Sequence, residues 1–71
     1  MKTISDLVYS MVTRDGFVAA FWRELAAARR LEPTTTQRMV FDRLNELFEA
    51  EFGRPRFVSF DAFRVYRDSK R

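Results

Sequence analysis

The basic residues that could bind phosphate gather in the last third of the chain. Residues 52–71 carry six basic and two acidic side chains, whereas residues 1–51 carry seven basic and eight acidic ones. Arginine offers a planar fork of donors that matches phosphate and also stacks on bases. Aromatic rings interleave with these cations, as a surface for phosphates and bases requires. The segment therefore predicts nucleic-acid binding through Arg54, Arg56, Arg64, Arg67, Lys70 and Arg71.

The same cations have a second interpretation, as the solvated face of a helix. Asp61 and Asp68 each lie three or four residues from an arginine. That spacing allows helical ion pairs worth about 0.2–0.5 kcal/mol each. Basic residues near the end of a helix also interact favourably with its dipole. Both interpretations stay open at this point.

Residues 24–39 resemble a helix-turn-helix. Ala26 is small where two helices would approach closely, and a short turn leads into a second helix. The sequence departs from the motif at Arg30, which replaces the usual turn glycine, and at Arg29, which replaces an apolar residue. Capping of the second helix also accounts for its threonine-rich start. The resemblance implies base contacts from the start of the second helix, with Thr35, Thr36 and Arg38 as the candidates.

A protein-interaction module is the alternative function. Ala19 and Ala26 lie on one side of the second expected helix, where small side chains allow another helix to approach closely. The other candidate surface is formed by aromatic residues that the core cannot cover, such as Trp22, Phe57 and Tyr66. The partner would be a second copy of the chain, or a protein that this chain regulates or inhibits. The candidate partner-binding residues are Trp22, Arg23, Arg30, Phe57 and Tyr66.

The segment from Gly53 to Arg64 has the pattern Gly-x-x-Arg-aromatic-x-Ser-aromatic-acid-small-Phe-Arg. It is similar to the C-terminal ending of small uncharacterised bacterial proteins, some of them encoded by phages or other mobile elements. The resemblance covers only this part of the chain and implies no particular activity. It favours an accessory protein.

Catalytic equipment is missing from the sequence. The chain has no cysteine and no histidine, which removes thiol nucleophiles, the commonest general base and the usual zinc ligands. The serines have no base to activate them. Asp42, Glu46 and Glu49 share one helical face and are interpreted as solvated. We therefore expect no enzyme activity, no cofactor and no metal. The absence of cysteine and of a long apolar run favours a cytoplasmic protein that does not bind membranes.

Helical periodicity and turn residues predict the elements that carry these side chains. Apolar residues recur at helical spacing over residues 3–13, 16–31 and 34–52, and a shorter helix is expected from residue 59 to about residue 69. Gly53 is expected to end the third helix in the left-handed conformation. A strand over residues 56–60 is the competing prediction for the segment that follows. The expected N-caps are Thr3, Asp15, Thr34 in a capping box with Gln37, and Ser59.

The aromatic content indicates how such a short chain builds a core. Eight phenylalanines, one tryptophan and two tyrosines compensate for the lack of disulfides and metals, because each buried ring removes about 150–250 Å² from water. We expect most of the rings to be buried. The predicted fold is all-α, a single domain over residues 1–71 with three amphipathic helices in a compact bundle and a short fourth helix.

Overall fold

The computed structural model describes residues 4–69, and the side chains of residues 6–69. Four helices occupy most of this range: α1 (Ile4–Ser10), α2 (Arg14–Leu31), α3 (Gln37–Phe52) and α4 (Phe60–Ser69). No strand occurs between residues 4 and 69, so the all-α prediction is confirmed and the alternative of a strand over residues 56–60 is wrong. None of the helices in the described range has the length and apolar character that a membrane span requires.

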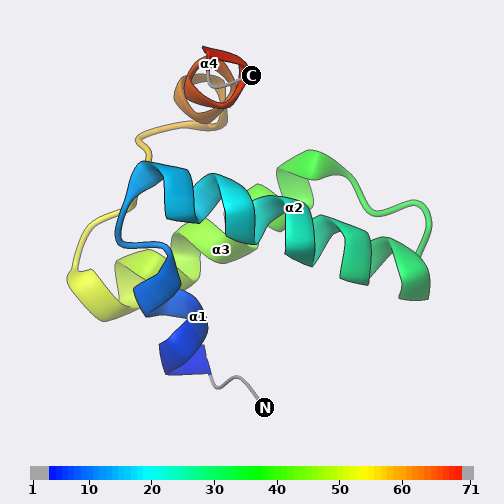
Figure 1. Ribbon diagram of the computed structural model, residues 1–71, viewed down its shortest axis with the longest axis horizontal. Helices are drawn as coiled ribbons and strands as arrows, with labels where there is room; N and C mark the ends of the chain where they lie inside the picture. Colours follow the sequence, from blue (N-terminus) through cyan, green and yellow to red (C-terminus); the bar gives the residue numbers. More distant parts are fainter. Residues whose placement is uncertain (1–3, 70–71) are drawn as a thin grey trace.

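The two long helices form a hairpin to which the two short helices are attached. Figure 1 shows α3 returning behind α2, with α1 near one end of the pair and α4 on the opposite side. Helix α1 contacts both α2 and α3, and α4 packs against α3. The hairpin therefore supplies the frame, and α4 is held on it by the loop of residues 53–59.

Two helices begin at caps other than the expected ones. Thr13, not Asp15, caps α2, and its side chain accepts a hydrogen bond from the Gly16 N–H at 2.9 Å. The reason is that α1 ends at Ser10, earlier than predicted, so that α2 follows after a turn of only three residues. A Cβ at Gly16 would lie 2.1 Å from the carbonyl oxygen of Ser10, so this tight turn requires glycine. The expected cap Thr3 lies outside the described residues.

Helix α3 is capped by Thr36, whose side chain accepts from the Met39 N–H at 3.2 Å. The predicted capping box from Thr34 is therefore wrong. The Thr34 hydroxyl instead donates to the Glu32 carboxylate at 2.9 Å. Of the three consecutive threonines, Thr34 and Thr35 donate their hydroxyls to Glu32, and Thr36 caps the helix.

The ends of the loop between α3 and α4 agree with the sequence prediction. Gly53 adopts φ 82°, in the left-handed region, and its N–H donates to the Glu49 carbonyl at 2.8 Å. Ser59 accepts from the Ala62 N–H at 3.1 Å, which caps the start of α4. Both predicted boundaries of this loop are confirmed.

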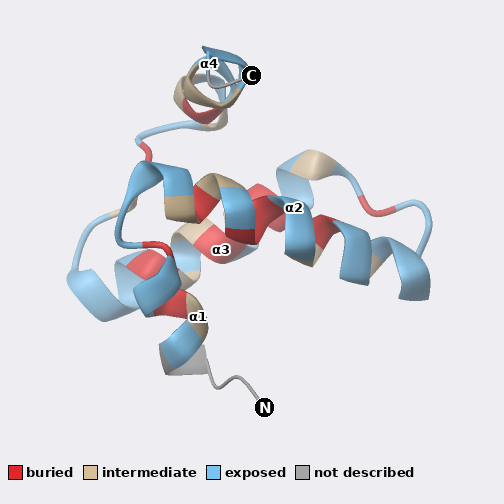
Figure 2. Ribbon diagram, in the orientation of Figure 1, coloured by how far each residue is buried: buried red, intermediate tan, exposed pale blue. Residues whose placement is uncertain are grey.

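Phe63 of α4 is at the centre of the aromatic core. Its ring centre lies 4.8 to 5.5 Å from the ring centres of Phe17, Phe21, Phe41 and Phe57. Figure 2 shows that the buried residues line the inner sides of all four helices. The expectation that phenylalanine builds the core is therefore correct, and α4 belongs to that core because it contributes the central ring.

Asn45 of α3 fixes the loop that precedes α4. Its amide Nδ2 donates to the Phe57 carbonyl at 2.8 Å, while its Oδ1 accepts from the N–H groups of Arg56 at 2.9 Å and Phe57 at 3.2 Å. One side chain thus satisfies three backbone groups of the loop. The loop is thereby held with Phe57 facing the core.

Candidate interaction surfaces

The guanidinium group of Arg56 packs against the protein. Its central carbon lies 5.8 Å from the ring centre of Phe48 and 5.9 Å from that of Phe57, both within the range of cation–π contacts. Its Nε is buried and has no hydrogen-bond partner among the described residues. Arg56 is therefore half-buried by the same loop geometry that Asn45 imposes.

Arg67 also turns inward, and it ties α4 to the two long helices. Its side chain is 15% exposed. Nη1 donates to the Gln37 side-chain oxygen of α3, and Nε donates to Asp68 at 3.1 Å. The guanidinium carbon lies 5.9 Å from the Trp22 ring of α2 and 5.8 Å from the ring of Phe63. Two of its nitrogens thus donate within the protein, and its guanidinium lies within cation–π range of two rings.

Two further arginines of the C-terminal third are exposed. Arg54 follows the end of α3, and Arg64 lies on α4, 3.6 Å from Asp61 in the predicted ion pair. Asp68 pairs with Arg67 rather than with Arg64. Lys70 and Arg71 lie outside the described residues. The structure therefore does not gather the four described arginines of this segment on one surface.

The three residues singled out by the helix-turn-helix resemblance also make contacts within the protein. Thr35 is 8% exposed, and its hydroxyl donates to the Glu32 carbonyl at 2.7 Å. The Thr35 carbonyl in turn accepts from Arg29 Nε at 2.9 Å. Thr36 caps α3, and Arg38 lies 3.7 Å from Asp42 and above the ring of Phe60. The hydroxyls of this turn thus serve the turn itself.

Two of the candidate partner-binding residues contribute to the fold instead. Phe57 is buried in the core, so its expected exposure is wrong. Tyr66 is half-buried, and its hydroxyl donates to Asp15 at 2.6 Å, which joins α4 to the start of α2. That hydrogen bond, with a smaller contribution from burial, raises the pKa of Tyr66 above its ordinary value.

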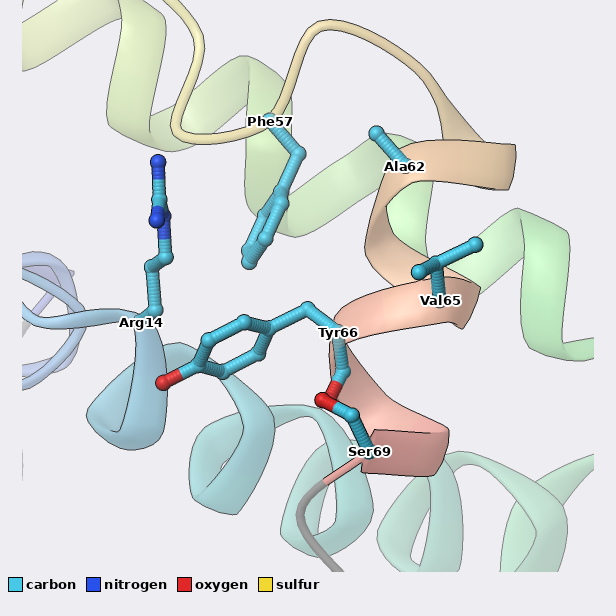
Figure 3. A pocket seen from close by; sticks show the side chains of 6 residues that line it. All are labelled: Arg14, Phe57, Ala62, Val65, Tyr66 and Ser69. Carbon is cyan, nitrogen blue, oxygen red and sulfur yellow. The ribbon is translucent and has the colours of Figure 1, made fainter.

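A hollow of about 310 Å³ lies beside this tyrosine, between the start of α2 and α4. Figure 3 shows Arg14 on one side of the Tyr66 ring, and the guanidinium carbon lies 5.8 Å from the ring centre. Apolar side chains form most of the wall. The hollow is lined by Arg14, Phe57, Ala62, Val65, Tyr66 and Ser69.

The remaining candidate residues share the outward side of α2. This surface, called the α2 face below, consists of exposed side chains between residues 19 and 30 and contains no acidic residue. Glu24, the acidic residue in that range, is half-buried on the other side of the helix. Arg23 and Arg30 are seven residues apart, which places them two turns apart on one edge of the face. Its members are Ala19, Trp22, Arg23, Ala26, Ala27 and Arg30.

Trp22 is the large apolar residue of the α2 face. It is 47% exposed although the core of the domain lies beneath it. The ring of Phe21 packs against it at 5.0 Å with a T-shaped geometry, and Arg67 lies against it from α4. Trp22 is therefore held in position while a large part of the indole remains in contact with solvent.

Comparison of this chain with protein-family models, with curated proteins and with solved structures found no match.

Proposed function

We propose that this protein is a non-enzymatic interaction module that binds an acidic surface of a partner protein through the α2 face. The observation that carries the proposal is the exposed, supported indole of Trp22 beside Arg23 and Arg30. Tryptophan and arginine are the residues most enriched among those that dominate binding energy at protein interfaces. The indole is already ordered, so that binding costs little side-chain entropy.

The small residues of the α2 face favour a helical partner. Ala19 and Ala26 lie between the tryptophan and the arginines, and they let another helix approach closely. The arginines at the edge require carboxylates on that partner. An amphipathic helix with an apolar stripe and acidic residues beside it has this chemistry.

Nucleic-acid binding is the competing function, and the arrangement of the C-terminal arginines supports it less well. Arg56 and Arg67 use their guanidinium groups within the fold, and Arg64 has an acidic neighbour. Arg54 and Arg64 are the exposed cations that a polyanion could still contact among the described residues of that segment.

Fluorescence of Trp22, the single tryptophan of the chain, provides the test. The probe is a designed helical peptide with an alanine and leucine stripe and glutamates seven residues apart, and the matched control peptide carries lysines instead. We expect the glutamate peptide to change the emission with half-saturation below about 1 mM. The lysine peptide is expected to have no effect.

Two double variants separate the candidate functions. Arg23→Glu with Arg30→Glu is expected to abolish the response to the glutamate peptide, whereas Arg54→Glu with Arg64→Glu, which has the same charge change, retains it. Equal responses to both peptides, or none to either, would overturn the proposal. Titration with duplex and single-stranded DNA at about 50 and 200 mM salt tests the competing function. DNA binding that only the Arg54 and Arg64 variant loses would assign nucleic-acid binding instead.

A further inference from the structure

The outward side of α3 carries the opposite charge to the α2 face. This surface, called the α3 face, has carboxylates at three positions one or two turns apart. The Asp42 side chain is 49% exposed, and one of its oxygens lies 3.7 Å from the Nε of Arg38, at the edge of the face. Met39 supplies an exposed apolar side chain, with 58% of its surface accessible. The members of the α3 face are Met39, Asp42, Arg43, Glu46, Glu49 and Ala50.

The two faces lie on opposite sides of the molecule. Helices α2 and α3 bury their inner sides against each other, with the rings of Phe17 and Phe41 5.9 Å apart. The outer sides of the two helices must therefore point away from one another. The α2 face of one molecule consequently cannot reach the α3 face of the same molecule, but it can reach that of another.

We infer that the acidic partner of the α2 face is the α3 face of a second copy of this chain. The inference rests on the proposed function and names the partner of the same site. Its basis is charge complementarity at matched spacing. Arg23 and Arg30 are seven residues apart on α2, and Asp42 and Glu49 are seven residues apart on α3. In both pairs the charges are separated by two helical turns, about 10.5 Å.

The order of residues across each face fixes the direction in which the helices pair. Across the α2 face, at 3.6 residues per turn, Trp22 lies at one edge and the arginines lie toward the other. Across the α3 face, Asp42 and Glu49 lie at one edge and Arg43 at the other, with Met39 between them. When two parallel helices pack side by side and are viewed down their axes, the clockwise edge of one contact face lies against the counterclockwise edge of the other.

Parallel pairing of α2 with the α3 of a second copy therefore brings the arginines to the carboxylates. With Arg23 opposite Asp42 and Arg30 opposite Glu49, Met39 falls between Ala19 and Trp22. Arg43 then lies on the tryptophan side, away from Arg23 and Arg30. Arg29 is exposed on that side too, and its Nε donates to the Thr35 carbonyl at 2.9 Å. An antiparallel pairing would instead place the arginines of α2 next to Arg43.

Such pairing is head-to-tail, because the α2 face of one copy binds the α3 face of the next copy. Each molecule keeps its second face available, so the association extends to larger species instead of ending at a dimer. One helix face is smaller than a standard protein interface, so we expect the contact to be weak and to strengthen at low ionic strength.

Sedimentation equilibrium of the whole chain in low salt tests the inference. The weight-average mass of the wild type is expected to rise with concentration up to about 1 mM. Arg23→Glu with Arg30→Glu makes both faces acidic, and Asp42→Arg with Glu49→Arg makes both faces basic. Each variant alone is expected to associate about 100-fold more weakly or not at all, because like charges meet at the contact.

An equimolar mixture of the two variants is expected to recover the association, since each offers the charge that the other lacks. Arg54→Glu with Arg64→Glu is the matched control, and it is expected to associate as the wild type does. Helical circular dichroism of each variant verifies that these exposed substitutions leave the fold intact.

The remaining outcomes separate the inference from the proposed function. A wild type that remains monomeric at all concentrations overturns the inference, while a Trp22 response to the glutamate peptide would still support the proposed function. Self-association that both charge reversals leave unchanged also overturns it, and would direct attention to the exposed Tyr9 and Phe52 rings, which pack at 5.8 Å. A monomer that gives no peptide response refutes both proposals.

Discussion

The arginines around α4 and those of the α2 face differ in what surrounds their guanidinium groups. Arg56 and Arg67 lie against aromatic rings, and Arg67 donates to side chains on two elements. Arg23 and Arg30 lie on the outer side of a long helix among alanines. The segment with the higher density of positive charge thus uses part of that charge to attach α4 to the hairpin, and the α2 face, with fewer cations, presents them to solvent.

The difference follows from how each segment is held. Helix α2 is long enough to have a buried side and a solvated side, so the direction of each arginine follows from its position on the helix. Helix α4 is short and is anchored through Phe63, Tyr66 and Arg67, which together span its inner side. An arginine on a short helix with a small apolar surface becomes part of the packing, because its long aliphatic stem also covers rings.

The largest expected effect comes from removing the centre of the α4 anchor. Phe63→Ala deletes a fully buried ring that contacts rings from every element around it, and it should cost about 3–5 kcal/mol. That is comparable to the whole stability of a domain of this size, so we expect the variant to unfold. Phe63→Leu should keep the fold at a cost of about 1–2 kcal/mol in urea denaturation.

Val65→Ala on the exposed side of the same helix is the control, with an expected change within about 0.5 kcal/mol. If the two alanine variants had similar stability, α4 would not be anchored through its inner side, and the contrast with the α2 face would disappear.

The next effect concerns the loop that turns Arg56 inward. Asn45→Ala removes the partner of three backbone groups, and we expect a loss of about 2–3 kcal/mol, since partly buried groups without hydrogen bonds are costly. Asn45→Asp keeps the acceptor and loses the donor, so its loss should be intermediate. Chemical denaturation measures both values, with Glu46→Ala as an exposed neighbour for comparison. A stability equal to that of the wild type for Asn45→Ala would show that the loop is held by other contacts.

A smaller effect on stability is expected when Arg67 and Arg30 are each replaced by alanine. Arg67→Ala should destabilise the protein by about 1–2 kcal/mol, through lost packing, hydrogen bonds and cation–π contacts. It should also shift the emission of Trp22, on which Arg67 lies. Arg30→Ala should change stability by less than about 0.5 kcal/mol. Thermal unfolding followed by circular dichroism ranks the two variants, and the reverse order would contradict the assignment of Arg67 to the fold and Arg30 to binding.

Local sequence patterns were sufficient to predict the four helices and several of their ends. Gly53 and Ser59 were correctly identified because each is the one residue nearby with the required chemistry, a left-handed glycine and a capping hydroxyl. The caps of α2 and α3 were wrong because several suitable residues stand side by side there. The choice between Asp15 and Thr13 depends on where α1 stops, which is a tertiary property.

The direction of the C-terminal arginines could not be read in the same way. The backbone at Arg56 is held by Asn45, which looks like an ordinary polar residue of α3 and whose partners lie 11 and 12 residues further along the chain. Arg67 is held by Gln37, 30 residues earlier in the chain. The outward position of Arg23 and Arg30 on α2, by contrast, was predictable from helical spacing. Trp22 was expected on the apolar side of that helix with Phe21, but it is 47% exposed and lies on the outward side. The contact between Trp22 and Arg67 joins segments that are distant in the sequence, and neither segment has a local pattern that predicts it.

The smallest predicted effect is the pH dependence of the bond between Tyr66 and Asp15. The phenol donates to the carboxylate, and an ionised phenolate would lose that bond and repel Asp15, so the pKa of Tyr66 is raised in the folded state. Arg14 and Arg56 oppose this shift without cancelling it. A folded-state pKa above the unfolded value means that the stabilisation is complete below about pH 10. It is then lost as the pH rises through the folded-state pKa.

Tyr66→Phe removes the titrating group and should therefore flatten this part of the pH profile. Urea denaturation of both proteins from about pH 8 to pH 11 measures the difference in stability, which should be constant below pH 10 and decrease above it. Phenolate absorbance, compared between the two proteins, reports the titration of Tyr66 directly. A difference that stays constant through the alkaline range would show that Tyr66 is not bonded to Asp15 in solution, and α4 would then depend on Phe63 and Arg67 for its attachment.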